Sequence, residues 1–532
     1  MTRFYLLVMA MVSPFISLAQ NYPAFTIVKN DTTNTGYYFM VPIKSTRNTA
    51  AIDPFHMIID KDGKVVYYKE FGLTTNTIDF KIQPNGLMSY FFQNRFWMMD
   101  SSFTIVDSIR TKNNITTDPH DFTILPNGNF LMLGFENLTQ DLSSYNLFLN
   151  NGTAGSTTAS VKCGVVQELD PGKNVVFEWH ASAHFNFLDV DTNRLLNPNI
   201  VDWTHCNAIR YDSDGNLLLS SRHFNEITKI NRSTGAVMWR MGGNANQFNF
   251  TNDSEMTIGQ HDAHRLDNGN LLLLDNGGDR TPFHPVRAKE YTLDEANLTA
   301  TLAWSHLYDS AIYSNAIGNV QRLDNGHTVI NYGNLSTVSV QPAFEELDAN
   351  GNLVYSITFP DTLTSYRVFN YPTLPWTLPR PQLTCYEQSG QHFLDAGSGH
   401  AQYLWSTGET TQSILITDTG EYSVFVPIGQ GGFISSETFH VTDMADPCNT
   451  LSNGVNEQSR NDIIVYPNPS DGNFEISGLD TGAKFELYDL SGKLKFEGTY
   501  SGSTSFDSLA KGIYHLRIKT TRAETDHKLV IQ

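Results

Sequence analysis

Four residues have the types and spacing to act together on one anionic group. Three histidines each precede an Asn-Gly or Asp-Gly pair by seven to nine residues, so they occupy one position in successive repeats. An arginine follows one of these pairs by eight residues, where the second strand of the hairpin comes back alongside the histidine in the first strand. The four residues are His120, His205, Arg222 and His261. Antiparallel pairing across the hairpin predicts that Arg222 lies beside His205.

The chemistry that suits this set is the binding and transfer of a tetrahedral anion. Arginine and imidazolium groups donate charge-assisted hydrogen bonds to its oxygens, and a neutral imidazole can act as a nucleophile. Three histidines could instead hold zinc with a water molecule. Against zinc, no carboxylate is evident at the same repeat position to support the ligands, and an adjacent arginine would repel a dication. A buried histidine can also be purely structural.

Other histidines are assigned no role in this chemistry. His223 follows Arg222, and strand alternation predicts that it points away from Arg222. His264 follows His261 by three residues, so alternation places it on the opposite face and indicates a structural role. The remaining candidates share no repeat position; they are His180, His184, His284 and His306.

The elements that must position these residues are short strands joined by tight turns. Asn-Gly or Asp-Gly pairs inside apolar runs favour type I′ hairpins; they begin at residues 85, 127, 214, 268 and 325. A second turn series, such as Asp62-Gly63, precedes aromatic strands. Alternation of the two series predicts four strands per unit, which is the blade of a β-propeller. Counting both series predicts six blades, with the Asp62 unit closing the ring against residues 36–43. A stacked β-sandwich is the alternative.

Composition shifts divide the chain into an all-β series of modules. A short apolar run and the small-x-small pattern Ser17-Leu18-Ala19 predict a cleaved signal peptide. A core tryptophan, Trp405, and short strands predict an immunoglobulin-like sandwich after the propeller. The expected modules are the signal peptide at 1–19, the β-propeller at 20–370, a Pro-rich linker at 371–382, the immunoglobulin-like domain at 383–442, a second linker at 443–462 and a small C-terminal β-sandwich at 463–532.

Charge, hydropathy and cysteine spacing exclude several classes of partner. The net charge of -20 and the lack of Lys and Arg clusters exclude nucleic acid. No window after the signal peptide approaches the roughly 20 apolar residues of a membrane-spanning helix. Cys385 and Cys448 bracket one module and can form a disulfide, whereas the pairing of Cys163 and Cys206 stays open. A Gly-rich phosphate loop with its lysine is absent, so no nucleotide donor and no cofactor is expected.

The local sequences around the four residues resemble the bacterial arylsulfotransferases. The motifs run in the same order from about residue 25 to 370; they include Asp118-Pro119-His120-Asp121-Phe122, Asp202-Trp203-Thr204-His205-Cys206-Asn207, Ser220-Ser221-Arg222-His223-Phe224, Gly259-Gln260-His261-Asp262-Ala263 and Gly318-Asn319-Val320-Gln321-Arg322. The resemblance implies a six-bladed propeller that moves a sulfuryl group from a phenolic sulfate ester to a phenolic acceptor. It also implies that His261 is transiently sulfated, with His205, Arg222 and His120 on the sulfuryl oxygens.

The C-terminal module resembles the sorting domain of cargo proteins of the type IX secretion system in Bacteroidota. The resemblance rests on Val465-Tyr466-Pro467-Asn468-Pro469, Leu487-Tyr488-Asp489-Leu490-Ser491-Gly492 and Gly512-Ile513-Tyr514. It implies export through the periplasm, passage across the outer membrane by the type IX machinery, and removal or anchoring of this module. The expected location is therefore the cell surface or the medium.

The chain departs from the arylsulfotransferase pattern at its cysteines, and two other functions stay open. The family's periplasmic members have a closely spaced disulfide near the site. Cys163 and Cys206 are distant in sequence, so the edge of the site must be formed here without such a disulfide between neighbouring residues. A non-catalytic extracellular propeller that binds glycans or phenolic compounds is one alternative, and a lyase or hydrolase on the same scaffold is another. The histidine-arginine set separates them, because binding alone does not require it.

Overall fold

The computed structural model describes most of the chain. The described residues are 22–29, 36–44, 53–72, 77–278, 283–336, 340–360 and 363–448, and in the C-terminal part 464–466, 475–477, 483–489, 493–499, 509, 512–519 and 524–531. The chain forms two compact units, Met1–Cys448 and Asn449–Gln532. The expected signal peptide and residues 449–462 of the second linker lie outside the described residues.

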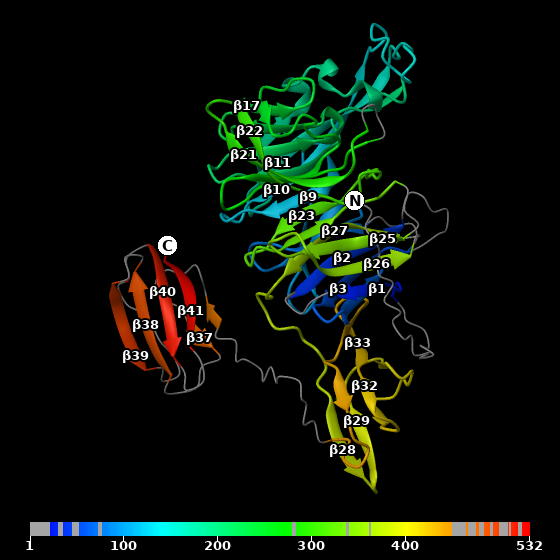
Figure 1. The fold of residues 1–532 in the computed structure, drawn as a ribbon, viewed down its shortest axis with the longest axis vertical. Helices are drawn as coiled ribbons and strands as arrows, with labels where there is room; N and C mark the ends of the chain where they lie inside the picture. Colours follow the sequence, from blue (N-terminus) through cyan, green and yellow to red (C-terminus); the bar gives the residue numbers. More distant parts are fainter. Residues whose placement is uncertain are drawn as a thin grey trace. The chain divides into compact units, whose positions relative to one another are not determined.

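Sheets that contain a run of four antiparallel strands make up most of the larger unit (Figure 1). The described residues contain six such sheets, of which two have four strands, three have a fifth strand and one has seven. In five of the runs, strands that follow one another in the chain pair with one another. From first to fourth strand the sheets are β5 (Thr77–Ile82), β6 (Met88–Phe92), β7 (Arg95–Met99) and β8 (Ile105–Ile109); β9 (Thr116–Ile124), β10 (Phe130–Gln140), β11 (Ala159–Leu169) and β12 (Val175–His180); β14 (Cys206–Tyr211), β15 (Leu217–Ser221), β16 (Glu226–Ile230) and β17 (Val237–Gly242); β19 (His261–Arg265), β20 (Leu271–Asp275), β21 (Arg287–Asp294) and β22 (Thr299–Leu307); β23 (Asn319–Arg322), β24 (Thr328–Asn331), β25 (Val340–Leu347) and β26 (Leu353–Pro360); and β27 (Leu363–Tyr371), β2 (Tyr37–Lys44), β3 (Phe55–Asp60) and β4 (Val65–Glu70).

The first strands of these sheets follow one another around a common centre. β5 contacts β9, and the contacts continue through β14, β19 and β23 to β27, which contacts β5 again. Residues near the ends of the first strands therefore converge. This arrangement confirms the expected all-β, propeller-type fold.

The ring is closed by strands from both ends of the propeller. β2 pairs with β3 as expected, but β27 supplies the first strand of that sheet by pairing with β2 from the far end of the domain. β1 (Thr26–Lys29) also pairs with the outer strand β26. No hairpin motif marks β27, because it pairs with a strand more than 300 residues away in the sequence. Sequence repeats alone could not reveal it.

The hairpin turns differ from the expected type I′. In the turn from Leu125 to Gly128, the N–H of Gly128 donates to the carbonyl of Leu125 at 2.8 Å. Gly128 has a positive φ of 82°, whereas Asn127 is not among the residues with positive φ. Type I′ needs positive φ at both central residues, and Pro126 cannot adopt it. The turn is therefore type I followed by a left-handed glycine.

The segment after the propeller, residues 384–441, is called the small unit here and forms part of the larger compact unit. It extends the sheet that closes the ring. Its strand β34 (Gly432–Ser435) pairs with β4, so β34, β33 (Val424–Ile428) and β30 (Leu404–Trp405) extend that sheet to seven strands. The other strands here are β28 (Thr384–Gln388), β29 (Gln391–Asp395), β31 (Ser413–Leu415), β32 (Gly420–Tyr422) and β35 (Phe439–Val441). Trp405 is buried and Cys385 is bonded to Cys448, as expected. The immunoglobulin-like class stays a prediction.

Short elements complete the description. They are the 3-10 turns η1 (Ala181–Ala183), η2 (Phe187–Asp189), η3 (Thr192–Arg194) and η4 (Arg222–Phe224), and the strands β13 (Ile200–Asp202) and β18 (Asn249–Thr251). In the C-terminal unit β36 (Ile464–Tyr466) pairs with β37 (Glu475–Ser477), and a second sheet has the order β39 (Leu494–Thr499), β38 (Lys484–Asp489), β40 (Gly512–Lys519) and β41 (Glu524–Ile531). Among the described residues, no helix has the length and apolar character needed to cross a membrane.

Candidate active site

The four predicted residues come from three adjacent sheets. His120 lies in β9, His205 directly precedes β14, Arg222 begins the turn after β15, and His261 begins β19. The rings of His120 and His205 meet edge to face with their centres 5.0 Å apart. The backbone N–H of Arg222 donates to the carbonyl of His205 at 3.0 Å, as the hairpin register predicted.

His223 belongs to this cluster, contrary to expectation. Its ring stacks on that of His205 at 4.6 Å, and its Nε2 lies 3.0 Å from Nη1 of Arg222. Strand alternation failed here because β15 ends at Ser221 and the next three residues form the turn η4. In a 3-10 turn, adjacent side chains do not alternate across a sheet.

Backbone strain marks the same region. His205 has a φ of 44°, and Ile317 has a φ of 58°. Left-handed backbone is uncommon outside glycine and is a genuine outlier for a β-branched residue such as isoleucine. Such conformations persist only where the surrounding structure enforces them, and they gather at functional sites.

The hydrogen bonds around His261 define its tautomer. Its Nδ1 lies 2.7 Å from Oδ1 of Asn276. The amide nitrogen of Asn276 donates to Oγ of Ser314 and to the carbonyl of Ile317, which fixes Oδ1 toward the histidine. Because that oxygen can only accept, Nδ1 carries the proton. Nε2 therefore holds a lone pair, and the N–H of Ile317 donates to it at 3.2 Å.

Burial keeps His261 neutral. The residue is 2% exposed, and this burial lowers the pKa of His261 well below its usual 6.5. The positive charge of Arg222 lowers the pKa further. A neutral ring with its lone pair on Nε2 is the nucleophilic form of histidine.

Two carboxylates orient the other histidines. Oδ1 of Asp118 accepts from Nδ1 of His120 at 2.5 Å, and Oδ2 of Asp202 accepts from Nδ1 of His205 at 2.5 Å. The expectation that no carboxylate supports these rings was therefore wrong. Each aspartate lies two or three residues before its histidine, so the signal was present in the Asp-Pro-His and Asp-Trp-Thr-His motifs.

In these two Asp–His pairs, Asp118 and His205 have pKa values that differ from those of the free side chains. Burial raises the pKa of Asp118, but His120 and Lys162 outweigh it and lower that pKa to about 2. Burial lowers the pKa of His205 to about 4, although its hydrogen bond to Asp202 acts in the opposite direction. At neutral pH the site thus contains ionised aspartates and a neutral His205.

One part of the cluster has metal-ligand types but does not fit a metal. Asp202, His205 and His223 offer ligand atoms within 4.8 Å of one another. Nδ1 of His223 points at the carbonyl of Asp202 at 2.5 Å, and its Nε2 faces the guanidinium of Arg222. Both ring nitrogens are therefore engaged, and a dication would lie beside a fixed positive charge.

A buried ionic network lies next to the histidines. Arg367 is 2% exposed and pairs with Asp79 at 2.9 Å and with Asp121 at 3.3 Å. Arg210 pairs with Asp121 and, at 2.6 Å, with Asp262. Asp121 and Asp262 directly follow His120 and His261, so the network anchors the strands that hold both histidines. It was not foreseen, because its members come from β5, β9, β14, β19 and β27.

The remaining candidates stay outside the cluster in the described contacts. Nδ1 of His264 donates to the backbone carbonyl of Asp262 at 2.7 Å. A register irregularity lies between His261 and His264, so simple alternation does not apply, and the structural role of His264 stays a prediction. Cys163 and Cys206 are both buried free thiols.

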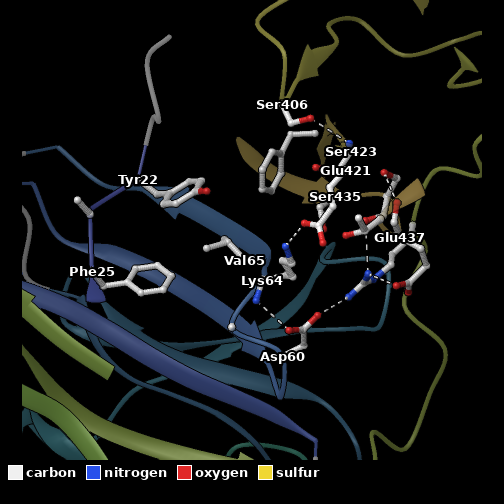
Figure 2. A pocket seen from close by; sticks show the side chains of 16 residues that line it. Tyr22, Phe25, Asp60, Lys64, Val65, Ser406, Glu421, Ser423, Ser435 and Glu437 are labelled. Atoms are coloured by element: carbon white, nitrogen blue, oxygen red, sulfur yellow. Dashed lines mark hydrogen bonds and ion pairs between the residues drawn. The ribbon is translucent and has the colours of Figure 1, made fainter. Parts of the chain in front are cut away.

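A cavity of about 370 Å³ lies away from the histidines, along the seam between the β3–β4 hairpin and the small unit (Figure 2). The N–H of Lys64 donates to Asp60 at 2.9 Å, and the Lys64 ammonium group pairs with Glu421. Arg380 pairs with Glu437 at 2.8 Å. No predicted site residue lines this cavity, which belongs to the seam.

Comparisons with known proteins give two family matches. The model of the arylsulfotransferase (ASST) family matches residues 24–367. The model of the secretion system C-terminal sorting domain matches residues 464–532. Among curated proteins, none matches the chain.

Several solved structures match the chain at low identity and with low TM-scores. A protein of unknown function from Bacteroides caccae is 13% identical over 63% of this chain and 98% of its own, with a TM-score of 0.38. A virginiamycin B lyase from Staphylococcus aureus is 12% identical over 77% of this chain and 99% of its own, with a TM-score of 0.33. PorZ of Porphyromonas gingivalis is 10% identical over 90% of this chain and 74% of its own, with a TM-score of 0.24.

The family matches confirm both sequence resemblances and the predicted location. The sorting domain indicates export by the type IX secretion machinery to the cell surface or the medium. The other match spans more than half of the sequence and contains all four predicted site residues. The chain therefore belongs to the arylsulfotransferase (ASST) family.

Proposed function

We propose that this protein transfers a sulfuryl group from a phenolic sulfate ester to a phenolic acceptor through a sulfated His261. The observation that carries the proposal is the state of His261, which is buried, neutral and held with its lone pair on Nε2. Arg222 and His120 supply the donors that a sulfuryl group in transfer requires, and His205 lies beside them.

In the first half-reaction, Nε2 of His261 attacks the sulfur of the donor and the bond from sulfur to the phenolic oxygen breaks. By analogy with phosphoryl transfer, the transition state is loose, so the protein mainly positions the group and stabilises its three oxygens. The N–H of Ile317 contacts Nε2 in the substrate-free enzyme. We expect it to pass to a sulfuryl oxygen when the donor binds.

His120 is the group that we assign to proton transfer. The departing phenolate takes a proton from His120, and Asp118 holds the ring through Nδ1, which leaves Nε2 to exchange that proton. His205 suits this role less, because burial lowers its pKa to about 4 and leaves it neutral at pH 7. Because its Nδ1 donates to Asp202, the neutral ring of His205 can only accept a hydrogen bond at Nε2 beside the sulfuryl group.

The second half-reaction reverses the first. The hydroxyl of an acceptor phenol loses its proton to His120 and attacks the sulfur, and the sulfur–nitrogen bond to His261 breaks. The neutral imidazole returns with its proton still on Nδ1. Donor and acceptor thus react in turn at one site, and added acceptor should speed release of the donor's phenol.

Mass spectrometry of the protein after mixing with 4-nitrophenyl sulfate tests this mechanism. A sulfuryl adduct is expected on the peptide that contains His261. His261→Ala should abolish both turnover and labelling, whereas Arg222→Ala should leave slow labelling, since loss of one electrostatic donor costs about 10²–10³ in rate. His264→Ala is the histidine control, because the contacts of His264 are with its neighbour Asp262, through the backbone carbonyl at 2.7 Å and the carboxylate at 3.8 Å.

Three outcomes would contradict the mechanism. An adduct on His120 or His205 would show that this histidine, and not His261, is the nucleophile. Full activity in His261→Ala would show that His261 is not required as a nucleophile. Tight binding of phenols without any transfer would favour the non-catalytic binding propeller instead.

A further inference from the structure

Lys162 lies between the two Asp–His pairs of the active site. It belongs to β11, and its Nζ pairs with Oδ2 of Asp118 at 3.4 Å. The strand β13 runs parallel to β11, with Asp202 opposite Lys162 in the register. The N–H of Trp203 donates to the carbonyl of Lys162 at 3.1 Å and fastens this register. Lys162 therefore contacts the first pair and is adjacent in the sheet to the second.

Asp118 uses its two oxygens for different partners. Oδ1 accepts from Nδ1 of His120 at 2.5 Å and from the backbone N–H of the same residue at 3.1 Å. Oδ2 accepts from the ammonium group of Lys162. The side chain of Asp118 is 5% exposed, so bulk water has little access to either oxygen. Lys162 thus holds the carboxylate through the oxygen that His120 does not use.

The ammonium group of Lys162 is itself held in place. Its Nζ lies 4.2 Å from the centre of the Phe135 ring, on the neighbouring strand β10. A cation near the face of an aromatic ring is attracted by the electrons of that face. Burial lowers the pKa of Lys162, but the charges of Asp118 and Asp202 outweigh it and raise that pKa. Lys162 therefore carries its charge at neutral pH beside Asp118.

A cation beside Oδ2 favours the carboxylate form of Asp118. A buried carboxylate without a cation takes up a proton more readily, and the proton nearest to Asp118 is the one on Nδ1 of His120. If that proton moved to Asp118, the ring would no longer be held as a donor at Nδ1, and Nε2 would not be reserved for the phenol. The charge of Lys162 opposes this transfer.

We propose that Lys162 is a positioning residue for proton transfer, because its ammonium group holds Asp118 as a carboxylate on Nδ1 of His120 and so keeps Nε2 of His120 available to the phenol. The inference rests on the proposed function for the reaction that His120 serves. Lys162 acts through Asp118 and is not itself a catalytic residue.

The rate at which two donors label His261 in the absence of acceptor tests this role. 4-Nitrophenolate is a weak base and leaves with little help from an acid, whereas phenolate is a stronger base and needs a proton as it departs. Lys162→Met should therefore slow labelling by phenyl sulfate about 10- to 100-fold, a part of the roughly 10²- to 10⁴-fold that acid–base catalysis contributes. Labelling by 4-nitrophenyl sulfate should change little. Lys162→Arg should restore most of the rate with phenyl sulfate, since it keeps the charge.

Two further variants separate this role from a general loss of structure. Asp118→Asn should slow labelling by phenyl sulfate, and adding Lys162→Met to it should cause no further loss, because Lys162 acts through Asp118. Lys112→Met, at an exposed position after β8, is the lysine control and should label as wild type does. Near-ultraviolet circular dichroism checks that each variant keeps its packing.

Proton NMR of the free enzyme reads the Asp118–His120 pair without turnover. The Nδ1 proton of His120 is protected from exchange with water only while a fixed acceptor holds it. His120→Gln identifies the signal of this proton by removing it. The signal should broaden or vanish in Lys162→Met and remain in Lys162→Arg.

The two proposals fail in different ways. An unchanged Nδ1 signal in Lys162→Met, an equal loss of rate with both donors, or additive losses in the double variant would overturn the role of Lys162, while the sulfotransferase function stands. A signal that depends on Lys162, in a protein that neither donor labels, would support the hold on Asp118 and overturn the proposed function.

Discussion

Asn276→Leu should slow sulfation of His261 because it removes the acceptor that holds the proton on Nδ1. Asn276 is 1% exposed and His261 is 2% exposed, so no bulk water replaces the lost 2.7 Å hydrogen bond. The carbonyl of Gly259, 3.1 Å from Nδ1, stays as the second acceptor, so the proton on Nδ1 loses one of two hydrogen bonds. One lost hydrogen bond costs about 0.5–1.5 kcal/mol. The tautomer with its proton on Nδ1 is then disfavoured by about 2- to 13-fold.

Single-turnover labelling with 4-nitrophenyl sulfate, quenched and read by mass spectrometry, measures this loss directly. Asn276→Asp keeps an acceptor for Nδ1 and should label faster than Asn276→Leu. Ser314→Ala removes a 3.0 Å hydrogen bond to the other end of Asn276 and leaves the contact with His261. Equal labelling rates in Asn276→Leu and wild type would refute the tautomer argument, as would an equal loss in Ser314→Ala.

The remaining predictions concern pH, maturation and metal. Because the pKa of His205 is about 4 in the folded protein against 6.5 for the reference group, the unfolded state binds protons more readily between those values. The unfolding free energy should therefore fall by up to about 3 kcal/mol from this site as pH drops from 6.5 to 4, and His205→Gln should flatten the profile in denaturant titrations; an unchanged slope would count against it. Intact mass of the secreted form should show loss of residues after about Asp462, and a species ending at Gln532 would contradict this. Activity should survive dialysis against a chelator; loss of activity that zinc restores would move the reaction to the Asp202, His205 and His223 cluster.

Most of the fold could be predicted from the sequence repeats, because each repeat reflects requirements of the local backbone. A glycine is needed where the backbone must turn with positive φ, and alternating apolar residues are needed where one strand face is buried. These requirements act within about ten residues, so the hairpins, the sheets that they join and the level of His120, His205 and His261 could be read from spacing alone. The strand β27 could not, because its partner β2 lies at the other end of the domain.

The sequence by itself determined which residues converge, since equivalent positions in successive blades must meet near the centre of a propeller. Tertiary structure decided how they act. The tautomer of His261 depends on Asn276 and Ile317, which come from other strands and loops. The turn η4 brings His223 into the cluster, where its ring stacks on that of His205. Spacing could not show these contacts, because hydrogen bonds between loops depend on where each loop is held in space.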